Sequence, residues 1–352
     1  MQQRTLGKSG LKVSEIGLGC WQLGGDFGPV EDERARDILD AAHTAEINFW
    51  DTADVYGGGL SERRIGTYRA AQGADVIVAT KVGRDGALFP DGYTRAKVRA
   101  NLQGSTERLG VEALDLVQLH CIPPEVLADG EILTWLEDFQ DEGLLRHFGA
   151  SIETLDEARL AMRHPRLTSL QMIVNLFRQD AVTELFPEAL ANEVGIIVRL
   201  PLASGVLAGK MRRDTQFDAS DHRNYNRHGE AFSQGETFSG IPFETALDLV
   251  EPLRDQVPTG LNMAQMAMRW LLDQPAVSTV ITGASKPLQV TENAAVSGLP
   301  PLPRELHERL AEYYRESVRP QIRVAICTVR PNGNFNRAER RFNAASATFC
   351  RR

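Results

Sequence analysis

Two stretches decide the fold: Val76-Ile-Val-Ala-Thr-Lys81 and Leu114-Asp-Leu-Val-Gln-Leu-His120. Both are short and rich in apolar residues, which is typical of strands in a parallel sheet that is covered on both faces. Between them, residues 94–109 have the apolar spacing of an amphipathic helix. Strand, helix and strand form one βαβ unit, and the chain repeats this unit along most of its length.

The repeat predicts eight strands, each followed by a helical stretch, and therefore a closed (β/α)8 barrel, also called a TIM barrel. We expect the first fifteen residues, with Lys8-Ser9-Gly10 as a turn, to form a β-hairpin at the bottom of this barrel. The predicted strands are 15–19, 47–51, 76–81, 114–120, 146–151, 169–175, 195–201 and 277–283. The predicted helices are 31–46, 61–72, 94–109, 131–143, 154–164, 181–193, 245–273 and 287–297.

The composition is that of a soluble globular protein, with 42% hydrophobic and 24% charged residues in a chain of 352. No apolar run reaches the ~20 residues of a membrane span, and the polar N-terminus lacks the apolar core of a signal peptide. The four cysteines, Cys20, Cys121, Cys327 and Cys350, have no spacing that suits a disulfide framework or a zinc site. We therefore expect a cytoplasmic protein with reduced thiols and no membrane partner.

Charge divides the chain into an acidic body and a basic end. Residues 319–352 hold eight arginines and one acid, Glu339, which makes +7. Because the whole chain carries −8, residues 1–318 carry −15, and this argues against nucleic acid as a partner. We predict one barrel domain over residues 1–320 and a basic, poorly ordered extension over 321–352. A nucleic-acid or membrane contact of that extension is the alternative to a segment without function.

Residues 211–242, after the seventh predicted strand, form the longest irregular stretch. A loop of this length inside a compact domain is usually functional or disordered. Its position places it at the mouth of the barrel, where we expect it to cover a ligand. A surface insertion without function is the alternative.

Four titratable residues follow three consecutive predicted strands. Asp51 and His120 end the second and fourth strands, Lys81 ends the third, and Tyr56 lies a short loop beyond Asp51. The carboxyl ends of barrel strands form the pocket floor, so these side chains should meet there. Each residue alone has an ordinary structural interpretation, such as a surface ion pair or a packed core histidine, but their convergence favours a catalytic group.

This set suits the reduction of a carbonyl group. Hydride addition builds negative charge on the carbonyl oxygen, and a proton donor must lie within hydrogen-bond reach of it. We expect Lys81 to favour the phenolate of Tyr56, and so to lower its pKa from about 10. Asp51 would hold the ammonium in place, and His120 would orient the carbonyl oxygen.

The sequence resembles the aldo-keto reductase family over roughly residues 3–320. The segments that carry the resemblance are Gly17-Leu-Gly-Cys-Trp-Gln-Leu-Gly24, Asn48-Phe-Trp-Asp-Thr-Ala-Asp-Val-Tyr-Gly57, Ala79-Thr-Lys81, the stretch ending at His120, Gly195-Ile-Ile-Val-Arg-Leu-Pro-Leu-Ala-Ser-Gly-Val-Leu-Ala-Gly-Lys210 and Val280-Ile-Thr-Gly-Ala-Ser-Lys-Pro-Leu-Gln-Val-Thr-Glu-Asn293. It implies an NADP-dependent oxidoreductase of small carbonyl substrates with the tetrad Asp51, Tyr56, Lys81 and His120. It also implies NADP(H) bound in an extended form across the barrel mouth, consistent with the lack of a G-x-G-x-x-G motif between a strand and a helix.

The resemblance further implies which residues touch the cofactor. Ser151 and Gln171 correspond to the residues that hold the nicotinamide carboxamide, and Leu202, Gly205 and Leu207 to backbone contacts with the pyrophosphate. Gly19, Cys20, Trp21, Asp51 and Arg199 correspond to further contacts around the reacting end. Gly283, Ala284, Ser285, Lys286, Gln289 and Asn293 correspond to the adenosine end, where a helix N-terminus faces phosphate.

The sequence departs from the family pattern at several of these positions. Ile152 stands where the family often has Asn, and Arg199 where an aromatic ring usually lies under the nicotinamide. An arginine plane can stack on a ring, but its charge would disfavour the positively charged oxidised cofactor and favour reduction. At the 2′-phosphate site, Gly283 and Gln289 replace two basic residues and leave Ser285 and Lys286 as polar candidates. We expect NADPH, with use of NADH as the alternative.

Two other functions compete with this interpretation. One is a cofactor-binding regulatory subunit with little turnover, of the kind that relatives provide to ion channels. The other is a metal-dependent barrel hydrolase, which typically needs His-x-His after the first strand, where this chain has Leu18-Gly19-Cys20. We expect no metal. Candidates for the substrate wall are Trp21, Arg84, Phe89, Tyr93, Phe217, Tyr225 and Phe232, while the substrate and the oligomeric state stay open.

Overall fold

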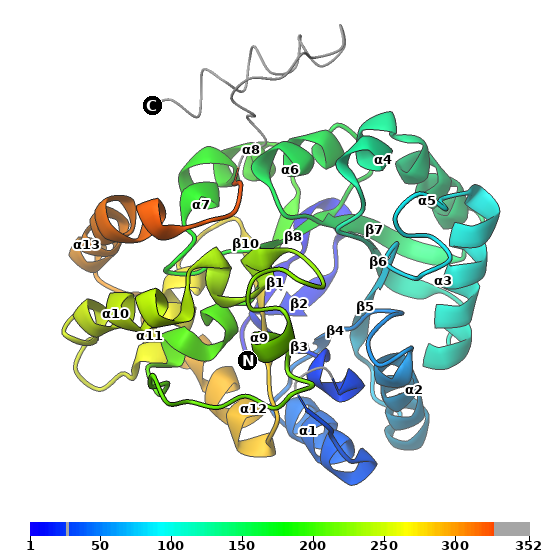
Figure 1. Cartoon of the computed structure of the whole chain (residues 1–352). Coiled ribbons are helices and arrows are strands. Elements are labelled where there is room, and N and C mark those ends of the chain that lie inside the picture. The colour runs from blue at the N-terminus through cyan, green and yellow to red at the C-terminus, as the bar shows by residue number, and fades with distance from the viewer. Residues whose placement is uncertain (26–27, 327–352) are drawn as a thin grey trace, which may run out of the picture.

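The computed structural model describes residues 1–25 and 28–326. Eight parallel strands form a closed barrel in the order β10-β3-β4-β5-β6-β7-β8-β9, with helices around it (Figure 1). The predicted barrel and all eight of its strands are confirmed. The strands are β3 (Ile16–Gly19), β4 (Phe49–Asp51), β5 (Ile77–Val82), β6 (Leu114–His120), β7 (Leu145–Ser151), β8 (Ser169–Ile173), β9 (Gly195–Arg199) and β10 (Val277–Gly283).

The predicted hairpin is also present. β1 (Gln3–Thr5) pairs antiparallel with β2 (Lys12–Ser14), and Gly10 turns the chain at φ 77°. Leu6 and Val13 of this segment belong to one apolar cluster with Phe49, Ala79, Leu116, Ile197 and Ile281 of the barrel strands. The hairpin therefore closes one end of the barrel and contributes side chains to its interior.

The helices pack outside the strands and bury a second, larger apolar cluster between the two layers. They are α1 (Asp32–Thr44), α2 (Leu60–Gln72), α3 (Arg95–Leu109), α4 (Pro124–Asp129), α5 (Glu131–Asp141), α6 (Leu155–Met162), α7 (Asp180–Glu184), α8 (Phe186–Ala191), α9 (His222–Tyr225), α10 (Phe243–Arg254), α11 (Met263–Leu272), α12 (Pro287–Ala294) and α13 (Arg304–Tyr313). Among the residues that the structure describes, no helix has the length and apolar character needed to cross a membrane.

Two of the predicted helices are wrong, because each is divided into two shorter helices in the structure. The stretch 245–273 is two helices, because the chain turns at Gly260 with φ 89° and Asn262 then begins α11 by accepting from Gln265 N. The stretch 181–193 is divided into α7 and α8 near Pro187, whose ring cannot continue a helix from within. Local turn chemistry overrides the apolar period at both places.

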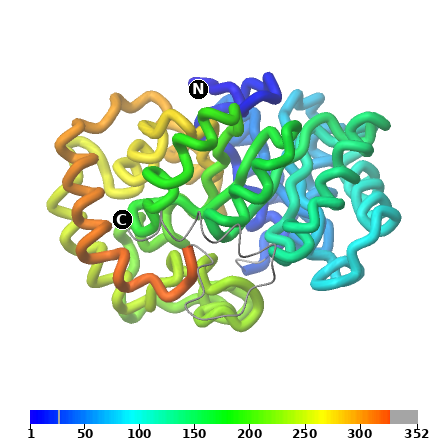
Figure 2. Tube along the Cα trace, turned by 90° about the horizontal axis from the view of Figure 1, so that it is seen from above, coloured from blue at the N-terminus to red at the C-terminus, as the bar shows by residue number. Residues whose placement is uncertain are grey.

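The stretch 211–242 follows β9 and lies at the opposite end of the barrel from the N-terminal hairpin (Figure 2). It is built of short helical turns, namely α9, η4 (Gln234–Glu236) and η5 (Phe238–Gly240). We call residues 211–242 the mouth loop.

The chain continues beyond α13 through a π-helical turn (Tyr314–Val318) and a 3-10 turn (Arg319–Gln321) to Ile326, which is buried. The start of the predicted basic extension, residues 321–326, thus packs on the barrel. The remainder of that extension, residues 327–352, lies outside the described residues.

Candidate active site

The four predicted catalytic residues converge at the barrel mouth. Asp51 ends β4, His120 ends β6, and Lys81 lies one residue before the end of β5. Strand pairing brings them to the same end of the barrel, because Asp51 pairs with Ala79, two residues before Lys81, and Lys81 pairs with Gln118, two residues before His120. Tyr56 reaches the same end from the turn between β4 and α2, and its ring lies 5.9 Å, edge to face, from the His120 ring.

Lys81 is the centre of this group, with only 1% of its side chain exposed. Its Nζ donates to Asp51 Oδ2 at 2.7 Å, to the carbonyl oxygen of Thr52 at 2.7 Å and to the Tyr56 hydroxyl at 3.3 Å. All three of its N–H groups thus have an acceptor, which offsets the cost of burying the side chain. The ammonium lies beside the phenol oxygen, as the residue types had indicated.

Asp51 connects this centre to two predicted cofactor ligands. Its Oδ1 accepts from Gln171 Nε2 at 2.6 Å and from Gln118 Nε2 at 3.4 Å, and Ser151 Oγ donates to Gln171 Oε1 at 3.2 Å. The carboxylate therefore positions Lys81 with one oxygen and the β8 amide with the other. Gln118 was not predicted, although it stands two residues before His120 in the same strand.

Burial shifts the pKa of both groups that face the cavity. Loss of hydration, followed by the charge of Asp51, raises the pKa of Tyr56 well above its usual value. The expected lowering of the Tyr56 pKa is therefore wrong, because burial outweighs the opposing positive charge, which comes from Arg199. Burial, together with the positive charges of Lys81 and Arg84, holds the pKa of His120 well below its usual value, so the imidazole is neutral.

These side chains form one end of an elongated cavity of about 560 Å³. Most of the predicted cofactor residues line it, and so do Asp51, Tyr56 and His120. Three predicted cofactor residues are not among the lining residues, so their cofactor contacts stay predictions. They are Cys20 and Leu207, which are buried in the core, and Lys286, which is exposed. The predicted cofactor residues along the cavity are Gly19, Trp21, Asp51, Ser151, Gln171, Arg199, Leu202, Gly205, Gly283, Ala284, Ser285, Gln289 and Asn293.

Aromatic rings form one wall next to Tyr56. Trp21 stacks on Tyr56 with ring centres 5.8 Å apart, and it also contacts His222 and Phe232 of the mouth loop. Of the candidates for the substrate wall, Trp21, Arg84, Tyr225 and Phe232 line the cavity, whereas Phe89, Tyr93 and Phe217 do not.

Arg199, at the end of β9, is held by an ion pair with Glu236 of the mouth loop. Its Nη2 also donates to the Ile152 carbonyl oxygen at 3.1 Å, while its Nε has no hydrogen-bond partner among the described residues. Burial alone would lower the pKa of the Arg199 guanidinium. The negative charge of Glu236 outweighs this effect and raises the pKa above its usual value. The charge that we expected to disfavour the oxidised cofactor is therefore largely neutralised by Glu236.

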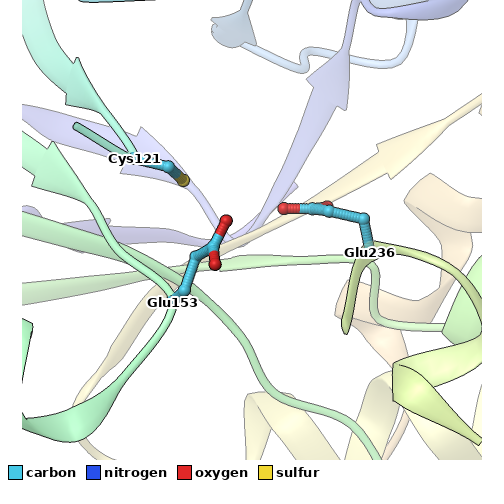
Figure 3. A group of neighbouring side chains, drawn as sticks. All are labelled: Cys121, Glu153 and Glu236. Atoms are coloured by element: carbon cyan, nitrogen blue, oxygen red, sulfur yellow. The ribbon is translucent and has the colours of Figure 1, made fainter. Parts of the chain in front are cut away.

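A cluster of possible metal ligands surrounds Arg199. One ligand atom each of Cys121, Glu153 and Glu236 lies within 4.8 Å of the other two, and the three side chains point toward one another (Figure 3). The guanidinium contacts two of them, Glu236 through Nη1 and the Cys121 sulfur through Nη2 at 3.7 Å. Because arginine already supplies the positive charge here, we assign no metal to this cluster.

The far end of the cavity is shaped by backbone turns and by α12. Ala203, Ser204 and Gly205 have positive φ, which turns the backbone after β9 around the cavity wall. Gln289 Oε1 accepts from Ser285 N at 2.8 Å and Lys286 N at 3.2 Å and so caps α12 with its own side chain. Gly283 faces Gln22 closely: a Cβ at this glycine would lie 2.0 Å from Gln22 Nε2.

Several lining residues were missed in the sequence. The polar or charged ones are Gln22, Cys121, Ser204, Lys210, Arg223, Glu236, Thr282 and Glu292. Lys210 closes the motif that begins at Gly195, so its place in the site could have been inferred. Glu236 lies in a stretch without periodicity, and nothing in the sequence indicates its pairing with Arg199.

Comparison with known proteins agrees with the fold and the site. A model of the aldo/keto reductase family matches residues 15–315. The uncharacterized oxidoreductase YqkF of Bacillus subtilis (strain 168) is 29% identical over 322 residues, which cover 90% of this chain and 98% of that protein. A probable voltage-gated potassium channel subunit beta of Oryza sativa subsp. japonica is 30% identical over 320 residues, covering 86% and 93%.

A solved structure, that of a glycerol dehydrogenase from Gluconobacter oxydans, aligns with a TM-score of 0.74 and 26% sequence identity. The alignment covers 95% of this chain and 98% of that one. The family match extends over most of the chain and includes all four residues of the rim. The chain therefore belongs to the aldo/keto reductase family and is an oxidoreductase of carbonyl compounds.

Proposed function

We propose that this protein reduces an aldehyde or ketone with NADPH, using Tyr56 as general acid and Lys81, Asp51 and His120 as its partners. The observation that carries the proposal is the position of Lys81 Nζ, which bridges Asp51 and the Tyr56 hydroxyl at the end of the cavity. Burying an ion pair beside a phenol costs desolvation free energy. An ion pair without a function would avoid this cost on the protein surface.

The cavity suits an extended dinucleotide. It runs from the rim residues, past the backbone turn at Ser204 and Gly205, to Gln289 and Asn293 on α12. Polar groups occur at both ends, and His120 Nδ1 is buried without a hydrogen-bond partner among the described residues. Ser151 and Gln171 would hold the carboxamide, and Lys210 supplies a positive charge toward the phosphates.

The protein's own residues supply the proton and stabilise the charge that its transfer leaves. Bound NADPH supplies the hydride for the carbonyl carbon. Tyr56 then donates its proton to the carbonyl oxygen, and the Lys81 ammonium at 3.3 Å stabilises the phenolate that is left. Its raised pKa keeps Tyr56 protonated until that moment. His120, neutral at physiological pH, orients the carbonyl oxygen through a hydrogen bond and does not act as the acid.

The test is a panel of sugar, aromatic and small α-oxo aldehydes, with glyceraldehyde included because one structural relative is a glycerol dehydrogenase. Oxidation of NADPH is followed at the nicotinamide absorbance. We expect many turnovers per protein with at least one aldehyde. A higher kcat/KM with NADH than with NADPH would overturn the cofactor assignment.

The second candidate is a cofactor-binding regulatory subunit, favoured by the similarity to a potassium channel subunit beta. The same assay separates the two functions. Oxidation that stops at one NADPH per protein in excess aldehyde would favour the regulatory subunit and contradict the enzyme.

A further inference from the structure

The segment 319–326, which we call the C-terminal strap, crosses from α7 to the mouth loop and on to the start of α6. Arg319 Nε donates to Asp180 Oδ1 at 2.8 Å at one end, and Leu155 N donates to the Ile326 carbonyl oxygen at 2.9 Å at the other. In the middle, Arg323 contacts Gly240. Both ends of the strap are thus fixed on the barrel, and its centre lies on η5 of the mouth loop.

The contact at the centre is close. Arg323 donates to the Gly240 carbonyl oxygen from its backbone N at 3.1 Å and from Nε at 3.3 Å. Val324 packs on the same residue so tightly that a Cβ on Gly240 would lie 2.9 Å from Val324 Cγ2. A Cβ on Gly235 would also touch this methyl group, at 3.6 Å. The strap therefore covers both glycines that flank the segment bearing Glu236.

Apart from the buried Phe238 ring, which packs on Phe217 and Phe243, that segment is held on the barrel side by hydrogen bonds. Ser204 Oγ donates to the Glu236 carbonyl oxygen at 3.0 Å and accepts from Phe238 N at 3.2 Å, and Asn175 Nδ2 donates to Ser239 Oγ at 3.0 Å. On its outer side, Val324 supplies the apolar packing. Because Phe238 and Ser239 have positive φ, this backbone is strained and depends on contacts on both sides.

We propose that Arg323 and Val324 are positioning residues of the active site, which hold Glu236 over the cavity and thereby limit release of the cofactor. The proposal rests on the proposed function, since it assumes that the cofactor occupies this cavity. The strap does not touch the reacting atoms. It acts through Glu236, whose carboxylate holds the Arg199 guanidinium at the cavity wall.

The test uses the full chain and measures the dissociation rate of NADPH by stopped-flow fluorescence. Val324→Gly removes the packing on Gly240 while leaving both backbone hydrogen bonds of the strap possible. We expect dissociation to become about fivefold to tenfold faster, because loop opening commonly sets release rates and the half-buried methyl groups of Val324 stabilise the closed loop. Hydride transfer in a single turnover at saturating NADPH should change less than about twofold.

Two further variants control for a general loss of structure. Val324→Ile keeps both γ-carbons that pack on Gly240, so its dissociation rate should stay close to that of the wild type, which a nonspecific defect would not allow. Arg315→Ala changes an exposed residue upstream of the strap and should have no effect. A Val324→Gly rate within twofold of the wild type would overturn the proposal, as would an equal acceleration in Arg315→Ala. Absence of NADPH binding to the wild type would instead contradict the proposed function.

Discussion

The two sides of the cavity are built in different ways. On one side, Asp51, Lys81 and His120 stand on neighbouring barrel strands, and backbone register fixes their spacing. On the other side, Arg199 obtains its partner Glu236 from a loop that is itself held by Ser204 and the C-terminal strap. The residues that we propose as catalytic thus stand on the sheet, whereas those that we propose to retain the cofactor depend on a loop.

The largest expected effect is on the side that stands on the sheet. Tyr56→Phe removes the proton donor but keeps the ring that stacks on Trp21. We expect kcat to fall about 1000-fold, within the range that general acids contribute, while the Kd for NADPH stays within about twofold. A variant that retains more than about a tenth of the wild-type kcat would contradict the role of Tyr56.

Lys81→Met should affect stability as well as rate. It leaves the Asp51 carboxylate buried without its counter-charge, which costs about 3–5 kcal/mol in the free energy of unfolding. The double variant Asp51→Asn/Lys81→Met removes both charges and should recover most of that stability, but no activity. Urea denaturation measures the first effect and the aldehyde assay the second. If Lys81→Met and the double variant are equally unstable, the loss of the counter-charge is not the cause of the instability.

Asp54, between Asp51 and Tyr56, makes the sheet side sensitive to pH. Burial, opposed by the hydrogen bond from Asn101 and aided by the charge of Glu62, raises the pKa of Asp54 to about 7. Since the folded state binds this proton more tightly than the unfolded state, the contribution of Asp54 to stability is fully present below about pH 4 and is lost as the pH rises to about 7.

Asp54→Asn should therefore flatten the pH dependence and stabilise the protein at pH 8 by roughly 1–3 kcal/mol relative to the wild type. Thermal unfolding at pH 5 and pH 8 measures the difference. Parallel pH profiles of the two proteins would show that Asp54 titrates normally.

The smallest expected effect is on the side that depends on the mouth loop. Glu236→Gln removes the charge that neutralises Arg199 next to the cofactor site. The oxidised nicotinamide is positively charged, so the ratio of the Kd for NADP⁺ to the Kd for NADPH should rise about fivefold, as expected for one partly screened charge. Glu230→Gln, on the same loop, is the matched control. An unchanged ratio in Glu236→Gln would place Arg199 away from the nicotinamide.

The difference between the two sides also explains what the sequence could predict. Alternation of strand and helix fixes the ends of barrel strands, so the positions of Asp51, Lys81 and His120 followed from periodicity. The breaks at Gly260 and Pro187 were missed because the apolar period continues through them. Each break depends on the φ angle of a single turn residue, and the apolar spacing does not show this angle.

Long-range pairing is what the sequence did not reveal. The partner of Arg199 lies 37 residues away in the mouth loop, and the contact of Val324 with Gly240 links the chain's end to its middle. Neither has a periodic or spacing pattern. The direction of the Tyr56 pKa shift was also beyond reach, because it depends on how far burial outweighs a neighbouring charge.

The proposed reduction requires that hydride reach the carbonyl carbon in this cavity many times per protein molecule. The most direct test uses NADPH in which both hydrogens at C4 of the nicotinamide are deuterium, with this cofactor and an aldehyde both in large excess over the protein. We expect deuterium on the carbinol carbon of the product, with many equivalents formed per protein and almost none with Tyr56→Phe. Product without deuterium, or no more than one equivalent per protein, would contradict it.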